Sequence, residues 1–511
     1  MKTASSELFD LIHSLTGRER AYFKRFAGIH KHSSSSNYLK LFDAILKQET
    51  YDETALKKQF EKDKLSRYFP RAKKYLYDKI LESMRLFHAE ASLSVQLKLQ
   101  INSARFLYSK KLFKQAMKKA QQIKKDAEAA EYWAEYLAAL EIETSILCRT
   151  GYKNTSYKDL QEFGKAGTMA LSRYGESYKH YCLERQMTYL LGRGGVFDGL
   201  EIESIFQKVL LDEDLKGVSP QIQRLYTLAL YSENYSKKPQ DAIRYYESAA
   251  DLMETHPTIM EKGVSSYLFF IGRLLQLGID QSSFQANQSY LQKIKTNLLN
   301  NIFLDYKGKE FEFVVKADYY YYSLLCLFEF GEHEQILSLM AESREELLKS
   351  ELSEIHPAHQ LRFPYIYMLI HFFQGEFEAA LESANAVFEI DIDLHPVKDK
   401  VRLWLLFIHF ELEHYDLLEH LIRNTIRYWK KQKTYDETRQ FWIEVLQKML
   451  RTTCELEVWR GAYEYLTTQN VCHPNLNSNR WNAYVLSKLE NKPLKEVHHR
   501  LIVTKKLTVT I

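Results

Sequence analysis

Glycine and proline are scarce in this chain of 511 residues, with 18 and 9 copies, against usual frequencies of about 7% and 5%. Because both residues interrupt regular structure, their scarcity predicts long helices and few irregular loops. The five cysteines are scattered singly, without a CxxC pair, which favours a reducing cytoplasm over a disulfide-linked exterior. The chain contains no long uninterrupted apolar run, so we expect no membrane-spanning helix and no membrane partner. The first residues also lack the features of a secretory signal.

Motifs that mark common enzyme sites are missing as well. The sequence has no GxxxxGK[ST] phosphate loop, no GxGxxG after a strand, no HExxH and no GxSxG. Because nothing nominates a nucleophile, a general base or a ligand set, we expect a non-catalytic protein with no cofactor and no metal. An enzyme whose site is assembled from scattered residues is the alternative.

What the chain does contain is a recurring motif: an aromatic helix end, a glycine or polar turn, then an aromatic residue, an acid and small apolar residues. The clearest copies lie at Phe328–Leu337, Phe372–Leu381 and Phe410–Glu419. The weaker copies lie at Lys111, Gly151, Gly195, Lys238, Gly278 and Gly461. The mean spacing is about 44 residues, and repeats of such length predict stacked helical hairpins, because a single hairpin cannot bury its apolar face alone.

The turn of this motif, with the form G-x-[FY]-[ED]-x-A-[LI], resembles that of the tetratricopeptide class of helical repeats. In the clearest unit, Gly375 lies at the turn and Phe377, Ala380 and Ala384 share one face of the next helix. We therefore expect an all-α protein in which an α-solenoid of tetratricopeptide-like hairpins covers residues 91–470. A small basic helical domain is expected at 1–90, and C-terminal capping helices with a short tail at 471–511.

Local signals place some helix ends and leave others open. Thr16 and Glu19 fit a capping box. Residues 93–101 alternate in polarity as a strand would, yet they also carry a helical stripe into the first repeat turn, and we expect a helix. The last eleven residues, LIVTKKLTVTI, are expected to form either a frayed tail or a strand.

The net charge of +4 conceals an imbalance along the chain. Residues 1–125 hold 27 basic against 12 acidic residues, a net of +15, whereas the remainder has a net of −11. Such asymmetry indicates a basic end that meets an acidic partner, or two ends that attract each other.

One predicted helix concentrates this basic charge on a single side. At 100° per residue, four lysines fall opposite an alanine-rich stripe; they are Lys111, Lys114, Lys118 and Lys125. The row is either a solvated face that keeps the protein soluble or a binding surface for an acidic protein or a nucleic acid.

Residues 52–88 contribute a second basic segment. Asp52 fits the N-cap of a short helix, and the next helix begins near Pro70 and bears Arg71, Lys73 and Lys74. Two helices joined by a polar break suggest a helix-turn-helix. Together with the repeats, this layout looks like bacterial regulators that join a DNA-binding module to a tetratricopeptide-like sensor array.

Two functional predictions follow. The preferred one is a cytoplasmic, non-catalytic scaffold that binds a protein or peptide partner on an extended helical-repeat surface. The alternative is a transcriptional or other regulator whose basic N-terminal region binds nucleic acid while the repeat array senses a ligand.

Overall fold

The computed structural model describes residues 6–29, 35–61, 68–89, 92–153, 155–192, 199–280, 284–296, 303–348, 360–390, 396–432, 434–452, 454–468 and 478–509. Helices account for 86% of the structure, and no strand occurs in these ranges. The expected all-α class is therefore confirmed.

Contacts along the chain divide it into two compact units, Met1–Gly175 and Glu176–Ile511, and the division falls within helix α9. The domain boundaries expected near residues 90 and 470 stay predictions. The helices that begin in the first unit are α1 (Glu7–Ser14), α2 (Gly17–Ile29), α3 (Ser35–Leu46), α4 (Glu53–Gln59), α5 (Phe69–Phe87), α6 (Leu93–Ser109), α7 (Phe113–Ala129), α8 (Trp133–Arg149) and α9 (Tyr157–Gly192).

The first unit contains two separate hydrophobic cores. Helices α1–α5 surround Phe23 and Phe42, whose ring centroids lie 4.9 Å apart. Helices α6–α9 bury a second set of apolar side chains, among which alanines are frequent. The capping box at the start of α2 is confirmed, because the Thr16 N–H donates to Glu19 Oε2 at 2.8 Å and the Glu19 N–H donates to Thr16 Oγ1 at 3.3 Å.

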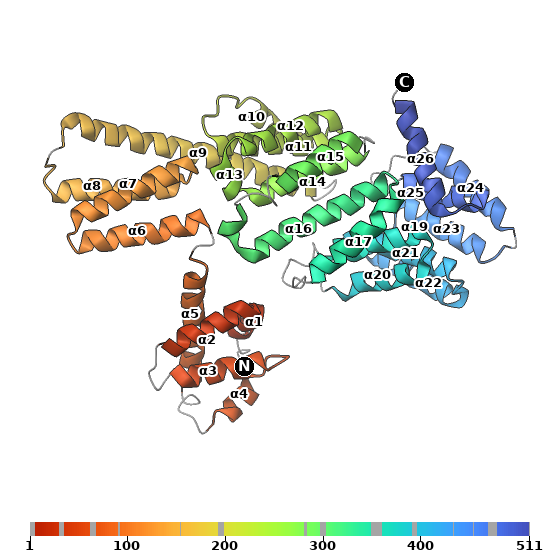
Figure 1. Ribbon diagram of the computed structural model, residues 1–511, viewed down its shortest axis with the longest axis horizontal. Coiled ribbons are helices and arrows are strands. Elements are labelled where there is room, and N and C mark those ends of the chain that lie inside the picture. Colours follow the sequence, from red (N-terminus) through yellow and green to blue (C-terminus); the bar gives the residue numbers. More distant parts are fainter. Residues whose placement is uncertain are drawn as a thin grey trace. The chain divides into compact units, whose positions relative to one another are not determined.

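The second unit is a succession of packed helices. They are α10 (Gly199–Leu210), α11 (Val218–Asn234), α12 (Pro239–Glu254), α13 (Pro257–Lys262), α14 (Val264–Asp280), α15 (Phe284–Ile294), α16 (Phe303–Glu329), α17 (His333–Leu348), α19 (Arg362–Gln374), α20 (Phe377–Glu389), α21 (Pro396–Glu411), α22 (Tyr415–Gln432), α23 (Glu437–Met449), α24 (Glu455–Thr468), α25 (Ser478–Glu490) and α26 (Leu494–Val509). Antiparallel pairs such as α11–α12, α19–α20 and α21–α22 lie side by side (Figure 1). The pairs stack upon one another, because α16 contacts α19, α19 contacts α21, and α21 contacts α23.

Seven of the turns between described consecutive helices share one backbone geometry. The turn residues have positive φ, and the residue after each donates its N–H to the carbonyl five positions earlier, at 2.7–3.1 Å. This is the hydrogen bond of a Schellman helix end. The turn residues are Lys111, Glu131, Gly151, Gly331, Gly375, Glu413 and Asn491. All but Glu131 and Asn491 lie at turns that the repeat motif predicted.

Two predicted turns are wrong. Gly278 and Gly461 lie inside α14 and α24. A side chain at Gly278 would overlap that of Asn287 on α15, so this glycine permits close packing of two helices instead of making a turn. Nothing in the structure explains Gly461, and the turn expected at Gly195 lies outside the described residues.

The two ambiguous segments are both helical. Residues 93–101 belong to α6, which buries Leu97 and Ile101 at helical spacing, so the helix prediction is confirmed. The C-terminal segment continues α26 to Val509, and the expected strand or frayed tail is wrong up to that residue. Ile502 in this segment is buried, and such packing outweighs the weak helix propensity of a β-branched residue.

Candidate binding surfaces

Helix α7 has two chemically opposite sides. Its buried side consists of Ala116, Ala120, Ile123 and Ala127, all fully covered. The opposite side carries Lys114, Lys118 and Lys125, and Lys111 lies in the preceding turn; all four lysines are exposed. We call Lys111, Lys114, Lys118 and Lys125 the lysine row. The predicted phase of this helix is confirmed, whereas a binding role for the row stays a prediction.

The lysine row differs from the other basic residues around it. Its four ammonium groups have no ion pair with any described residue. By contrast, Lys124 binds the buried carboxylate of Glu143 at 2.6 Å, and its ammonium lies 5.8 Å from the Tyr136 ring centroid. On α6, Arg105 lies 3.5 Å from Glu141 of α8. Lys124 is therefore a structural residue, while the lysine row is available to a partner.

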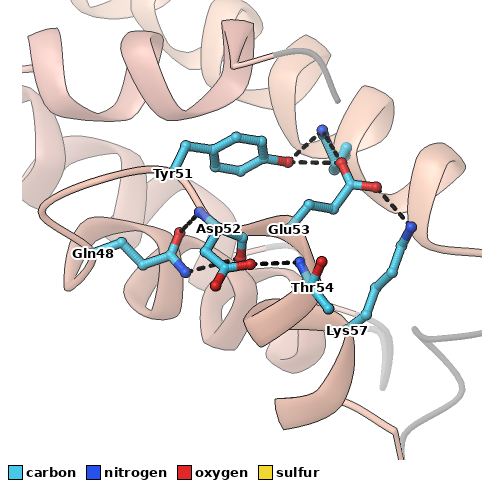
Figure 2. A network of polar contacts seen from close by, with 7 residues as sticks. Gln48, Tyr51, Asp52, Glu53, Thr54 and Lys57 are labelled. Atoms are coloured by element: carbon cyan, nitrogen blue, oxygen red, sulfur yellow. Dashed lines mark hydrogen bonds and ion pairs between the residues drawn. The ribbon is translucent and has the colours of Figure 1, made fainter. Parts of the chain in front are cut away.

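The second basic segment is divided in the same way. Lys73 on α5 donates to the Tyr51 hydroxyl at 2.5 Å and to Glu53 Oε2 at 2.8 Å. Tyr51 itself donates to Glu53 at 2.9 Å, and Lys57 pairs with the same carboxylate at 2.7 Å (Figure 2). Arg71 and Lys74, in contrast, are exposed. Of these three residues, Lys73 is therefore bonded within the protein, whereas Arg71 and Lys74 face solvent.

The Glu53 network joins the start of α4 to α5. Burial opposes ionisation of the Glu53 carboxyl, but hydrogen bonds from Lys57, Lys73 and Tyr51 outweigh it and lower its pKa to about 2. Asp52 caps α4 as predicted, because its carboxylate accepts from the N–H groups of Thr54 and Ala55 at 2.8 and 2.9 Å (Figure 2). Residues 62–67 between α4 and α5 lie outside the described residues, so the helix-turn-helix stays a prediction.

In the second unit, helix α25 packs against the stacked helices instead of leaving them open. Trp481 stacks on Trp404 of α21 and on Trp442 of α23, with ring centroids 4.3 and 4.2 Å apart. On the same helix, Tyr484 donates its hydroxyl to Glu411, and Lys488 pairs with that carboxylate at 2.6 Å. The side of α21 and α23 that α25 covers is therefore unavailable to another protein.

A buried ion pair accompanies this packing. The Arg480 guanidinium donates to the Glu329 carboxylate of α16, and to the Tyr365 hydroxyl of α19 at 3.2 Å. Arg480 also lies 5.2 Å from the ring centroid of Phe328. The sequence predicted capping helices in this region but gave no sign of the buried Arg480. An arginine beside a tryptophan in a polar segment carries no signal of burial when its carboxylate lies 151 positions away.

A cleft of about 610 Å³ lies where the turn after α19 meets the start of α26. Its walls include Glu411, Glu455, Trp459, Lys488 and Lys495. Because Glu411 is bonded to both Tyr484 and Lys488, its charge is already neutralised. Three lysines and two glutamates line the cleft, and two of these, Lys488 and Glu411, pair with each other.

Metal sites and membrane-spanning helices are not found in the part of the chain that the structure describes. There, no group of three or more His, Cys, Asp or Glu side chains is placed to hold a metal ion. No helix within the described ranges is long and apolar enough to span a bilayer. Cys148, Cys182, Cys326 and Cys454 are free, and burial raises the pKa of the Cys326 thiol to about 12, which suppresses its nucleophilic thiolate form.

Comparison of the chain with protein-family models, with curated proteins and with solved structures found no match.

Proposed function

We propose that this protein is a non-catalytic scaffold that binds an acidic protein or peptide partner through the lysine row. The observation that carries the proposal is the contrast on α7: four exposed, unpaired lysines lie opposite fully buried alanines. Because the alanine side holds the helix in place, the lysine side chains can pair with carboxylates of a partner without disturbing the core.

The same proposal includes a tetratricopeptide-like α-solenoid in the cytoplasm. Its support is the Schellman bond repeated at seven turns and the stacking of helix pairs along the second unit. Solenoids of this kind present long surfaces to partners. Since α25 covers one side of α21 and α23, we assign recognition to the outward side of α7 instead.

The test replaces the four residues of the lysine row by glutamine. The matched control replaces four exposed lysines of the second unit, which also removes four charges: Lys208, Lys238, Lys400 and Lys431. Wild type and both variants serve as bait in a pull-down with mass spectrometry, and the affinity of the purified partner is then measured at several salt concentrations.

We expect an acidic partner that is retained by wild type and by the control but lost by the lysine-row variant. Binding to wild type should weaken as salt rises, because exposed charges are screened. Melting of the variant should be nearly unchanged, since exposed substitutions usually shift stability by at most about 0.5 kcal/mol each. Unchanged binding of every partner by a normally folded variant would mean that the row is only a solvated face.

A second candidate function, binding of nucleic acid by the first unit, is favoured by the net charge of +15 in residues 1–125 and by the exposure of Arg71 and Lys74. In that case the full chain should bind a short DNA duplex, with an affinity that falls by a slope near −0.9 per neutralised phosphate. Replacing Arg71 and Lys74 by glutamine should reduce that slope by about two. Absence of binding even at low salt would exclude this function.

A further inference from the structure

Helix α26 packs on α25 and also contacts α17 through a pair of histidines. His498 of α26 is fully buried, and its Nδ1 lies 3.2 Å from Nε2 of His333, the first residue of α17. Its imidazole ring packs between two aromatic rings, with centroids 5.2 Å from Phe328 and 4.8 Å from Phe373. The other ring nitrogen, Nε2, has no hydrogen-bond partner among the described residues. No described carboxylate forms a hydrogen bond with His498, so a charged His498 has only the His333 ring as a hydrogen-bond partner.

Two further contacts of α26, both with the turn before α17, lie next to this pair. The His499 Nδ1–H donates to the carbonyl oxygen of Gly331 at 2.9 Å, in the turn before α17. The Ile502 side chain reaches the same glycine, whose missing Cβ leaves room for it. The contacts of α26 with α17 and with the turn before it are therefore centred on His498, whereas α26 also packs on α25, where Arg500 pairs with Glu490 at 2.5 Å.

The charged groups around the pair are mostly positive. Arg480 of α25 repels a proton on His498, and Lys495 of α26 repels a proton on His333. His499 repels a proton on either ring. The carboxylate of Glu329 on α16 is engaged by Arg480. Helix α19 contributes the uncharged Phe373, and its Tyr365 hydroxyl accepts from Arg480. Positive charge on either imidazole is therefore repelled by neighbouring cations. His333 also lies at the N-terminus of a helix, where positive charge is unfavourable.

The hydrogen bond between the rings sets a second limit. One ring nitrogen must donate and the other must accept, so the contact requires at least one neutral imidazole. When both rings are protonated, all four nitrogens become donors and two N–H groups face each other across 3.2 Å. The contact then turns from attractive to repulsive inside an aromatic pocket.

We propose that the His333–His498 pair makes the docking of α26 acid-sensitive, so that α26 separates from α17 and α19 when both imidazoles are protonated. Separation would uncover the aromatic surface of Phe328 and Phe373, which α26 covers at neutral pH. The proposal concerns a conformational change and is independent of what the lysine row binds.

The direction of the pH effect follows from the shifts of the two groups. Burial, with His499 and Lys495 nearby, lowers the pKa of His333 to about 4. Burial, with His333, Arg480 and His499 nearby, lowers the pKa of His498 well below its usual range. Each imidazole therefore binds a proton more weakly when α26 is docked. Docking is at full strength above a pH of about 6.5 and weakens below it, by about tenfold per pH unit for each histidine.

Hydrogen exchange of the full chain, followed by mass spectrometry, tests this. Labelling times at each pH are scaled for the intrinsic pH dependence of exchange. We expect peptides from residues 494–504 to lose protection between about pH 6.5 and about pH 5, with the docking constant falling up to about a hundredfold per pH unit. Peptides from α21 and α23 should stay protected over that range.

Two variants separate the pair from other acid effects. In His498→Phe an aromatic ring remains but the proton site is lost, so the loss of protection should be reduced to about tenfold per pH unit. His420→Phe on α22 changes an exposed histidine and should behave as wild type. If His498→Phe leaves α26 unprotected at pH 7, His333→Gln takes its place under the same expectation. The proposal is overturned if α26 stays protected at pH 5, if it opens together with α21 and α23, or if the substituted pair responds as wild type.

Discussion

Two sets of basic side chains, one in each unit, have opposite roles. On α7 of the first unit, Lys114, Lys118 and Lys125 are exposed and have no ion pair with any described residue. In the second unit, Arg480 is 9% exposed and donates to Glu329 and Tyr365. The charge itself is the same, but burial decides its role, because a buried cation must be paired while an exposed one is already stabilised by water.

The same comparison holds within the first unit. Lys73 and Lys74 are adjacent in sequence, yet Lys73 is bonded to Tyr51 and Glu53 whereas Lys74 is exposed. A count of basic residues therefore overestimates the charge that a partner can meet. The predictions below test how strongly each kind of basic or packed residue contributes to stability, from the largest expected effect to the smallest.

The largest effect is expected from Arg480→Met. This change leaves the Glu329 carboxylate buried without its cation, and removing one member of a buried pair typically costs about 3–5 kcal/mol. Chemical unfolding followed by tryptophan fluorescence measures it, because five of the six tryptophans lie in the second unit. The double variant Arg480→Met/Glu329→Gln should recover part of the loss. A single variant as stable as wild type would show that the pair contributes little.

The buried side of α7 should respond at an intermediate level. Ala120 is fully buried among helices, so Ala120→Leu would overpack the core at a cost of about 1–3 kcal/mol. The neighbouring Gln121 is exposed, and Gln121→Leu should change stability by no more than about 0.5 kcal/mol. Thermal melting followed by circular dichroism compares the two. Equal effects at both positions would contradict the assignment of the two sides of α7.

A smaller effect is expected from Glu53→Gln, at about 1 kcal/mol, because the ion pairs of Glu53 are partly exposed. The folded-state pKa of Glu53, about 2, lies below its usual value of 4.5. Its contribution is therefore complete above pH 4.5 and is lost as the pH falls from 4.5 towards 2. Hydrogen exchange in α4 and α5 should show this loss in wild type and not in the variant. It should occur at lower pH than the release of α26.

Several elements could be predicted from neighbouring residues alone. The capping box of Thr16 and Glu19 and the N-cap Asp52 depend on contacts within three positions, so the sequence contains all of their partners. The turns at Gly331 and Gly375 were predicted for a similar reason, because a residue with positive φ favours glycine and the motif marks its place. The turn predicted at Gly278 was wrong, because this glycine lies within a helix and its absent side chain makes room for Asn287 of another helix.

The sequence by itself determined the helical class, the two-sided pattern of α7 and most of the repeat turns, because each rests on periodicity or on bonds between near neighbours. Only the tertiary structure decided which charged side chains are exposed and which are paired inside the protein. Lys73 meets Glu53, Arg480 meets Glu329 and His498 meets His333 across 20, 151 and 165 positions. Such contacts depend on how distant helices pack, and no local pattern encodes the position of a partner so far along the chain.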